Sequence, residues 1–249
     1  MLEIEPIAAF RDNYIWALSV SAVAVVVDPG DAAPVERWLV QHGRRLAAIL
    51  VTHHHHDHIG GLAALKRRWA PRVYGPAAEP IEEVDLAVAE GDRISPAAGF
   101  PAFGVLEVPG HTGGHVAYYG AGLLFCGDTM FSAGCGRLFE GTPAQMYRSL
   151  SRLAALPAET RVYAAHEYTV DNLRFARSLL PADGALAQAL ENAVTIRADA
   201  QATLPSTIGR EREINLFLRV GEPELRAAIA ERTGGSLPTH SEVFAALRR

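Results

Sequence analysis

A run of potential metal ligands near residue 55 constrains the fold of this chain more than any other feature. The apolar segment 47–52 has the length and composition of a buried strand, and Gly60-Gly61 then opens a helix. Between them lie His53, His54, His55, His56, Asp57 and His58. Open α/β sheets place their ligands at the carboxyl ends of strands. The run therefore predicts a metal site at such an edge.

The spacing within the run suggests that one segment can serve two metal ions. If the backbone stays extended, His53 and His55 project to the same side, and the following turn brings Asp57 and His58 to an adjacent point. A solvated histidine-rich loop is the alternative interpretation. The position between a strand and a helix disfavours it.

Three more candidate ligands each follow an apolar strand: His111, Asp128 and His166. Together with four residues of the run they give five imidazoles and two carboxylates, a set that suits zinc, iron or manganese. A carboxylate can bridge two ions about 4 Å apart, and we assign that role to Asp128. The predicted ligands are His53, His55, Asp57, His58, His111, Asp128 and His166.

The chain of 249 residues, 49% of them hydrophobic, can form one large domain or one domain with a small annex. Its N-terminus lacks the pattern of a signal peptide, and no apolar run approaches the roughly 20 residues of a membrane span. Two cysteines and a net charge of -5 favour a reducing compartment and disfavour nucleic acid as a partner. We expect a cytoplasmic protein, a monomer, that binds neither membranes nor nucleic acid.

The pattern of apolar residues divides the chain near residue 170. Before that point strands and helices alternate, which predicts an α/β fold. The expected strands are 14–20, 23–28, 47–52, 105–108, 115–119, 123–126 and 161–165, and the expected helices are 34–42, 61–69 and 142–156. Beyond it the spacing is helical, over 171–180, 185–201, 222–232 and 241–248, which predicts a helical annex.

The segment 52–58, with His111, Asp128 and His166, resembles the ligand motif of the metallo-β-lactamase superfamily. The segments 134–141, 166–169 and 203–219 resemble the glyoxalase II (hydroxyacylglutathione hydrolase) family more narrowly. The resemblance implies a four-layer αββα sandwich over residues 1–170 and a helical glutathione-binding domain over 171–249. It also implies that His53, His55 and His111 hold one metal, that Asp57, His58 and His166 hold a second, and that Asp128 bridges them.

The activity implied by the resemblance is hydrolysis of the thioester S-D-lactoylglutathione to D-lactate and glutathione, the second step of methylglyoxal detoxification. Two divalent ions, with zinc first and iron or manganese as alternatives, would generate a bound hydroxide near neutral pH, with Asp57 and Asp128 as the catalytic carboxylates. The alternatives are a persulfide dioxygenase with one iron, or a lactonase, β-lactamase or RNA-processing nuclease of the same fold. A metal-binding scaffold without activity is a further alternative.

By the same resemblance, Arg137, Phe139, Tyr168 and Arg248 occupy positions that contact glutathione. Arginine suits the carboxylates of this ligand because its guanidinium binds them in a bidentate way. Phe139 stands where the family often has a tyrosine, so this chain lacks one hydrogen bond to the ligand. The family pattern continues to a lysine, whereas this sequence ends at Arg249, and Arg249 or a lysine elsewhere is the candidate replacement.

Several neighbours of the ligands have simpler interpretations. Asp28, before Pro-Gly, is expected to be a turn residue rather than a residue that orients a ligand histidine. Structural roles are expected for His54, His56 and His115. Because Cys126 and Cys135 lack the spacing of metal-binding cysteines, we expect both to be small buried hydrophobes.

Overall fold

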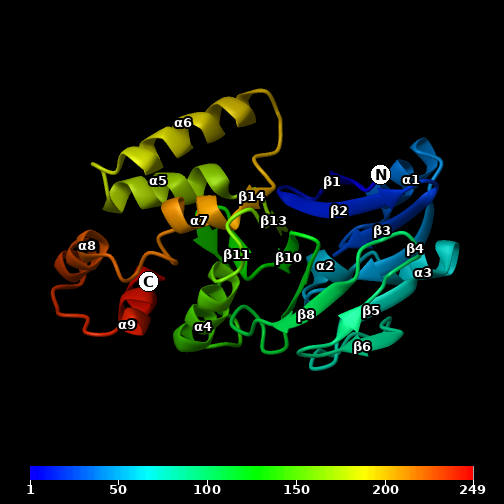
Figure 1. Cartoon of the computed structure of the whole chain (residues 1–249), viewed down its shortest axis with the longest axis horizontal. Coiled ribbons are helices and arrows are strands. Elements are labelled where there is room, and N and C mark those ends of the chain that lie inside the picture. The colour runs from blue at the N-terminus through cyan, green and yellow to red at the C-terminus, as the bar shows by residue number, and fades with distance from the viewer. Residues whose placement is uncertain (249) are drawn as a thin grey trace.

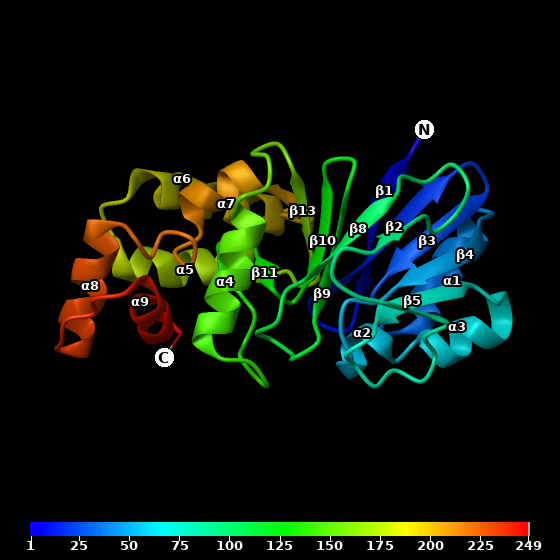
Figure 2. The same ribbon diagram turned by 60° about the horizontal axis from the view of Figure 1, so that its bottom comes forward.

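The computed structural model describes residues 1–248, whose strands form two facing six-stranded sheets and a small two-stranded ribbon (Figures 1 and 2). The first sheet has the order β1-β2-β3-β4-β5-β6. The pairs from β1 to β3 are antiparallel, and those from β3 to β6 are parallel. Its strands are β1 (Glu3–Ala9), β2 (Asn13–Val20), β3 (Val23–Val27), β4 (Arg45–Leu50), β5 (Arg72–Pro76) and β6 (Leu86–Val88).

The second sheet has the order β14-β13-β10-β9-β8-β7. Only the β10–β13 pair is parallel among its described pairs. The strands are β7 (Arg93–Ile94), β8 (Phe103–Glu107), β9 (Val116–Gly120), β10 (Leu123–Gly127), β13 (Arg161–Ala164) and β14 (Ser206–Thr207), and the separate ribbon is β11 (Met130–Phe131) with β12 (Gly134–Cys135).

Alternation along the strands creates a layer on each side of the first sheet. In β3, Val25 and Val27 contribute to the core between the sheets, while Ala24 and Val26 face the opposite way. Successive strand residues point to opposite faces, so a strand that is apolar at every position is buried on both. The outer face is covered by α1 (Ala32–Gln41) and α3 (Leu62–Trp69).

Helix α4 (Pro143–Ala154) packs its apolar side into the larger core next to the second sheet, through Met146, Leu150 and Leu153. It begins with a capping box between Thr142 and Gln145, which satisfies free backbone groups at the helix start. The order of layers is helix, sheet, sheet, helix, as the resemblance implied.

The remaining helices follow the sheets in sequence and form the annex at one end of the molecule (Figure 1). They are α5 (Thr169–Leu179), α6 (Gly184–Ala198), α7 (Ile208–Ile214), α8 (Pro223–Thr233) and α9 (His240–Leu247), while the short α2 (His56–Ile59) lies in the histidine run. Between α6 and α7 the chain returns to the second sheet as β14, antiparallel to β13.

The sequence patterns missed β1, β5, β6, β7, β11, β12, β14 and the two short helices α2 and α7. Strand β1 lies at a sheet edge, is mostly exposed and contains Pro6, which is tolerated at edges but weakens a strand prediction. The others are short or carry few apolar residues.

Candidate metal centre

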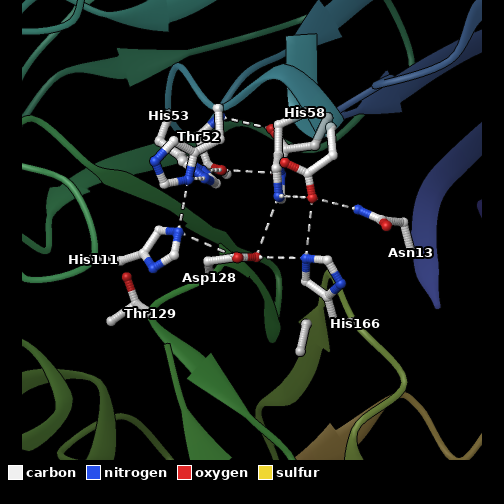
Figure 3. A network of polar contacts seen from close by, with 12 residues as sticks. Asn13, Thr52, His53, His58, His111, Asp128, Thr129 and His166 are labelled. Carbon is white, nitrogen blue, oxygen red and sulfur yellow. Dashed lines mark hydrogen bonds and ion pairs between the residues drawn. The ribbon is translucent and has the colours of Figure 1, made fainter. Parts of the chain in front are cut away.

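The seven predicted ligands come together at one edge of the sandwich. Figure 3 labels five of them: His53, His58, His111, Asp128 and His166. His53, His55, Asp57 and His58 follow β4, and His111 lies in the connection between β8 and β9. Asp128 and His166 follow β10 and β13. Residues separated by more than 100 positions therefore meet because their strands end at the same edge.

Three imidazoles form the first cluster. His55 Nδ1 lies 3.2 Å from His53 Nε2 and 2.9 Å from His111 Nε2. Ligand nitrogens 2.0–2.1 Å from a tetrahedral zinc ion stand about 3.4 Å apart. The three nitrogens have nearly that separation.

Asp128 lies between this cluster and a second one. Its Oδ1 atom is 3.3 Å from both His58 Nε2 and His166 Nε2, and its Oδ2 atom is 3.3 Å from His111 Nε2. Asp57 Oδ2 completes the second cluster, 3.6 Å from His58 Nε2 and 3.5 Å from His166 Nε2. One carboxylate thus faces both clusters (Figure 3).

The most buried polar atoms of the site lack hydrogen bonds of good geometry. Among residues 1–248 this holds for both ring nitrogens of His58 and for Asp128 Oδ1. Buried polar groups are rarely left unsatisfied, and carboxylates almost never. A cation beside His58 Nε2 and Asp128 Oδ1 would supply the missing interaction, so the residues fit a divalent metal.

The outer nitrogen of each of four ligand histidines faces an oxygen of the protein. His111 Nδ1 lies 2.8 Å from the Arg137 carbonyl, and His166 Nδ1 lies 2.8 Å from Asp12 Oδ1. The other two contacts are His53 Nδ1 to Thr52 Oγ1 at 3.0 Å and His58 Nδ1 to Asp28 Oδ2 at 3.1 Å. Such contacts orient the ring and leave Nε2 for a metal.

The interpretation of Asp28 as only a turn residue was wrong. It does adopt a left-handed backbone conformation, with φ of 53°. However, its carboxylate is buried, accepts hydrogen bonds from Thr52 N and Thr52 Oγ1 at 2.7 Å each, and faces His58. Asp28 therefore anchors the start of the histidine run.

Burial and charge favour the metal-binding protonation state at three of the predicted ligands: His53, His111 and Asp128. At His58 and His166 the neighbouring carboxylates, chiefly Asp128, outweigh burial and raise the pKa. Burial and the neighbouring imidazoles, first His58, lower the pKa of His53 well below its usual value, and burial also lowers the pKa of His111. For Asp128, burial opposes ionisation, but attraction to His58 and His166 outweighs it and holds the pKa well below its usual value. A neutral imidazole and an ionised carboxylate are the forms that coordinate metals.

The other histidines of the region differ in role. His115 is fully buried, stacks on His53 with ring centroids 4.6 Å apart, and accepts a hydrogen bond from Asp128 N through Nε2. His56 is exposed, and His54 pairs with Glu79. Cys126 and Cys135 are buried free thiols, as predicted.

Sequence reasoning missed three polar residues of the site. Asp12 contacts His166, Asn13 Nδ2 donates to Asp57 Oδ2 at 2.9 Å, and Glu79 accepts from the backbone of His54. Each contacts a predicted ligand or, for Glu79, the residue between two of them, at least 25 positions away in sequence. No local motif marks them.

Two adjoining cavities meet at Arg137. A cavity of about 570 Å³ is lined by five of the seven predicted ligands, together with Arg137, Phe139 and Tyr168. These five are His55, Asp57, His111, Asp128 and His166. A second cavity of about 450 Å³ is lined by Arg137, Leu138, Pro143, Ala245 and Arg248. The structure thus brings the predicted substrate residues to one continuous surface beside the ligands, while Arg249 lies outside the described residues.

Aromatic side chains frame the first cavity. Tyr168 stacks on His166, with ring centroids 4.8 Å apart and planes 8° apart. Phe139 is 63% exposed and presents its edge to His55 and His111. Burial and the neighbouring Asp12 and Asp128 carboxylates raise the pKa of Tyr168 to about 12, so its phenol stays protonated near neutral pH.

The annex holds the segment that follows Asp128. Glu211, fully buried on α7, accepts hydrogen bonds from Ser132 Oγ at 3.0 Å and Ala133 N at 2.8 Å. Asn215 Nδ2 donates to the carbonyls of Phe131 and Gly134 at 3.2 and 2.9 Å. The segment 131–134 thus lies between the metal centre and the annex.

Comparison with known proteins decides the family. Residues 13–166 match the metallo-beta-lactamase superfamily, and residues 167–249 match the hydroxyacylglutathione hydrolase C-terminus. A hydroxyacylglutathione hydrolase of Pseudomonas paraeruginosa is 55% identical over 254 aligned positions, which cover 100% of this chain and 98% of the relative. The chain belongs to the hydroxyacylglutathione hydrolase family. A hydroxyacylglutathione hydrolase of Cupriavidus taiwanensis, 53% identical with 100% and 97% of the two chains covered, agrees.

Solved structures place the hydroxyacylglutathione hydrolase family member among metallo-β-lactamase folds. ETHE1 from Myxococcus xanthus superposes with a TM-score of 0.67 at 24% identity, over 99% of this chain and 96% of that one, which shows the fold. TTHA1623, solved in a di-iron-bound form, is 27% identical with a TM-score of 0.61, over 86% of this chain and 100% of that one.

These comparisons confirm the predicted superfamily, the αββα fold and the narrower family, and they favour a hydroxyacylglutathione hydrolase over the alternatives. The family and the His/Asp clusters together support divalent metal binding. Within residues 1–248, no helix combines the length and apolar character needed to cross a membrane.

Proposed function

We propose that this hydroxyacylglutathione hydrolase family member cleaves the thioester S-D-lactoylglutathione to D-lactate and glutathione, using two divalent metal ions. The observation that carries the proposal is the pair of adjoining cavities that share Arg137. One contains the clustered metal ligands, and the other is lined by two arginines. A ligand with a thioester near one end and carboxylates near the other matches this arrangement.

In this proposal His53, His55 and His111 hold the first ion, and Asp57, His58 and His166 hold the second. Asp128 is shared between them. Bound divalent ions of this kind lower the pKa of water from 15.7 to about 7 and polarise a carbonyl oxygen. We propose zinc first, with iron or manganese as alternatives, because imidazole and carboxylate accept all three.

The chain's own residues position the substrate. The guanidinium groups of Arg137 and Arg248 bind the carboxylates of glutathione. The protonated phenol of Tyr168 supplies a hydrogen-bond donor beside His166. Phe139 makes T-shaped contacts with His55 and His111 and limits the access of bulk water to them.

The chemistry of the leaving group explains why no strong protein acid is required. A thiol with a reference pKa near 8.5 departs as a stabilised thiolate. Asp57 and Asp128 act by holding the reacting centre together, since both carboxylates are ionised and face the ligand histidines.

The two parts of the chain, residues 1–170 and 171–249, have different proposed roles. We assign catalysis to residues 1–170 and propose that residues 171–249 help to bind glutathione, through Arg248 on the wall of the cavity that Arg137 also lines. A monomeric cytoplasmic enzyme remains the prediction from composition, and the molecular mass in solution tests the oligomeric part.

The decisive experiment couples elemental analysis to an assay of S-D-lactoylglutathione hydrolysis. We expect two metal equivalents per chain, release of one thiol per thioester and no consumption of oxygen. Two bound metals without thioesterase activity would refute the substrate while sparing the metal site. One iron with oxygen consumption on a persulfide would point to the dioxygenase instead.

A further inference from the structure

A buried carboxylate outside the predicted ligand set connects the two loops that carry the first metal cluster. Glu79 lies between β5 and β6, and its side chain is 1% exposed. Its Oε2 atom accepts a hydrogen bond from His54 N at 2.7 Å and contacts His54 Nδ1. His54 lies between two ligands, His53 and His55, so Glu79 fixes their backbone.

The other oxygen of Glu79 holds the loop that carries His111. Glu79 Oε1 accepts hydrogen bonds from Thr112 Oγ1 and from Gly114 N, the latter at 3.0 Å. Gly114 permits this approach, because a Cβ atom there would lie 2.7 Å from Glu79 Cγ. One carboxylate thus joins segments that are more than 50 residues apart.

The contact extends to the substrate side through the imidazole of His54. Its Nε2 atom lies 3.3 Å from Glu140 Oε1, and Glu140 Oε2 accepts a hydrogen bond from Gly113 N at 2.7 Å. The segment 137–141 also meets the His111 loop directly, since Phe139 N donates to His111 O at 3.2 Å.

We propose that Glu79 is a positioning residue that holds the loops of His53, His55 and His111 at ligand separation before a metal binds. Glu79 is the buried carboxylate of this network, whereas Glu140 is exposed, and four nitrogen or hydroxyl groups surround the two oxygens of Glu79. Without it, the two loops would have to be ordered at the expense of metal-binding free energy. The inference rests on the proposed metal site but not on the identity of the substrate.

The test measures metal affinity by competition with a chromophoric chelator, with no substrate present. We expect Glu79→Gln to weaken the binding of the ion held by His53, His55 and His111 by about 10- to 100-fold. This is the range found when residues that support metal ligands are changed. Excess metal should restore thioesterase activity. Glu82→Gln is the matched control, because Glu82 is an exposed glutamate of the same connection. An affinity of Glu79→Gln within twofold of the parent chain would overturn the proposal, whatever the thermal stability.

A milder variant keeps the test decisive if Glu79→Gln does not fold. Thr112→Val removes one donor to Glu79, and a lost hydrogen bond to a charged group predicts about a tenfold weaker affinity. Unchanged affinity in that variant also counts against the proposal. So does a third metal equivalent in the parent chain that Glu79→Gln lacks, since His54, Glu79 and Glu140 would then be ligands themselves. A parent chain that binds two metal ions but does not hydrolyse the thioester would instead reject only the proposed function.

Discussion

The metal-ligand cluster and the arginine-lined cavity lie side by side but are built in opposite ways. His53, His58 and Asp128 are at most 7% exposed, and the outer ring nitrogens of both histidines face oxygens of the protein. Arg137 and Phe139 are exposed, and Phe139 reaches 63%. The proposed reacting centre is therefore held by contacts within the protein, whereas the proposed recognition surface consists of exposed side chains.

The largest expected effect is on the shared carboxylate. Asp128→Ala removes the one group that faces both clusters, and we expect loss of one metal equivalent and a fall in kcat/KM of about 10³-fold or more, since metal stabilisation amounts to several kcal/mol. Asp171→Ala, an exposed aspartate paired with Arg174, should leave both quantities unchanged. Retention of two metals by Asp128→Ala would contradict the bridging role.

A smaller effect on metal binding is expected at Asp28, which contacts the predicted ligand His58. Asp28→Asn keeps an acceptor for Thr52 but removes the negative charge 3.1 Å from His58 Nδ1. We expect metal affinity to fall by about 10- to 100-fold, measured by chelator competition. Asp31→Asn is the control, because asparagine caps a helix as well as aspartate does. Equal metal affinities in Asp28→Asn and Asp31→Asn would contradict a supporting role of the Asp28 charge in metal binding.

The recognition surface should respond in KM rather than in kcat. Arg137→Ala removes a guanidinium but leaves the backbone carbonyl that holds His111. Loss of a charged hydrogen bond predicts a rise in KM of about tenfold with kcat nearly constant, and Arg248→Ala should behave alike. Arg210→Ala, an exposed arginine on α7, serves as control. A fall in kcat as large as the rise in KM would break the separation between the two regions.

The smallest expected effect is an improvement in substrate binding. Phe139→Tyr restores the hydroxyl that the family often has at this position, and one neutral hydrogen bond predicts a decrease in KM of about threefold to tenfold. Steady-state kinetics on S-D-lactoylglutathione measure it. An unchanged KM would mean that the exposed ring at 139 does not reach the ligand.

The same contrast explains what could be predicted from sequence. Asp128 and His166 were found because each directly follows an apolar strand, and strand ends gather at one edge. Asp12 and Glu79 were not found, because each acts through a contact that only the folded chain creates. Asp28 was misjudged since its left-handed backbone does suit a turn, while its carboxylate is turned inward to Thr52. Local pattern therefore predicted which side chains gather at the strand ends, but not which residues hold them in place.

The return of the annex to the second sheet bears on how the two parts of the chain can be recombined between relatives. A graft that replaces residues 171–249 exchanges an edge strand of the sandwich as well as a set of helices, because β14 pairs with β13. It also exchanges Glu211, whose carboxylate is enclosed by Ser132 and Ala133 of the other part. A chimera that takes its annex from a relative should therefore take the relative's segment equivalent to 131–134 as well, so that Glu211 keeps its matching donors.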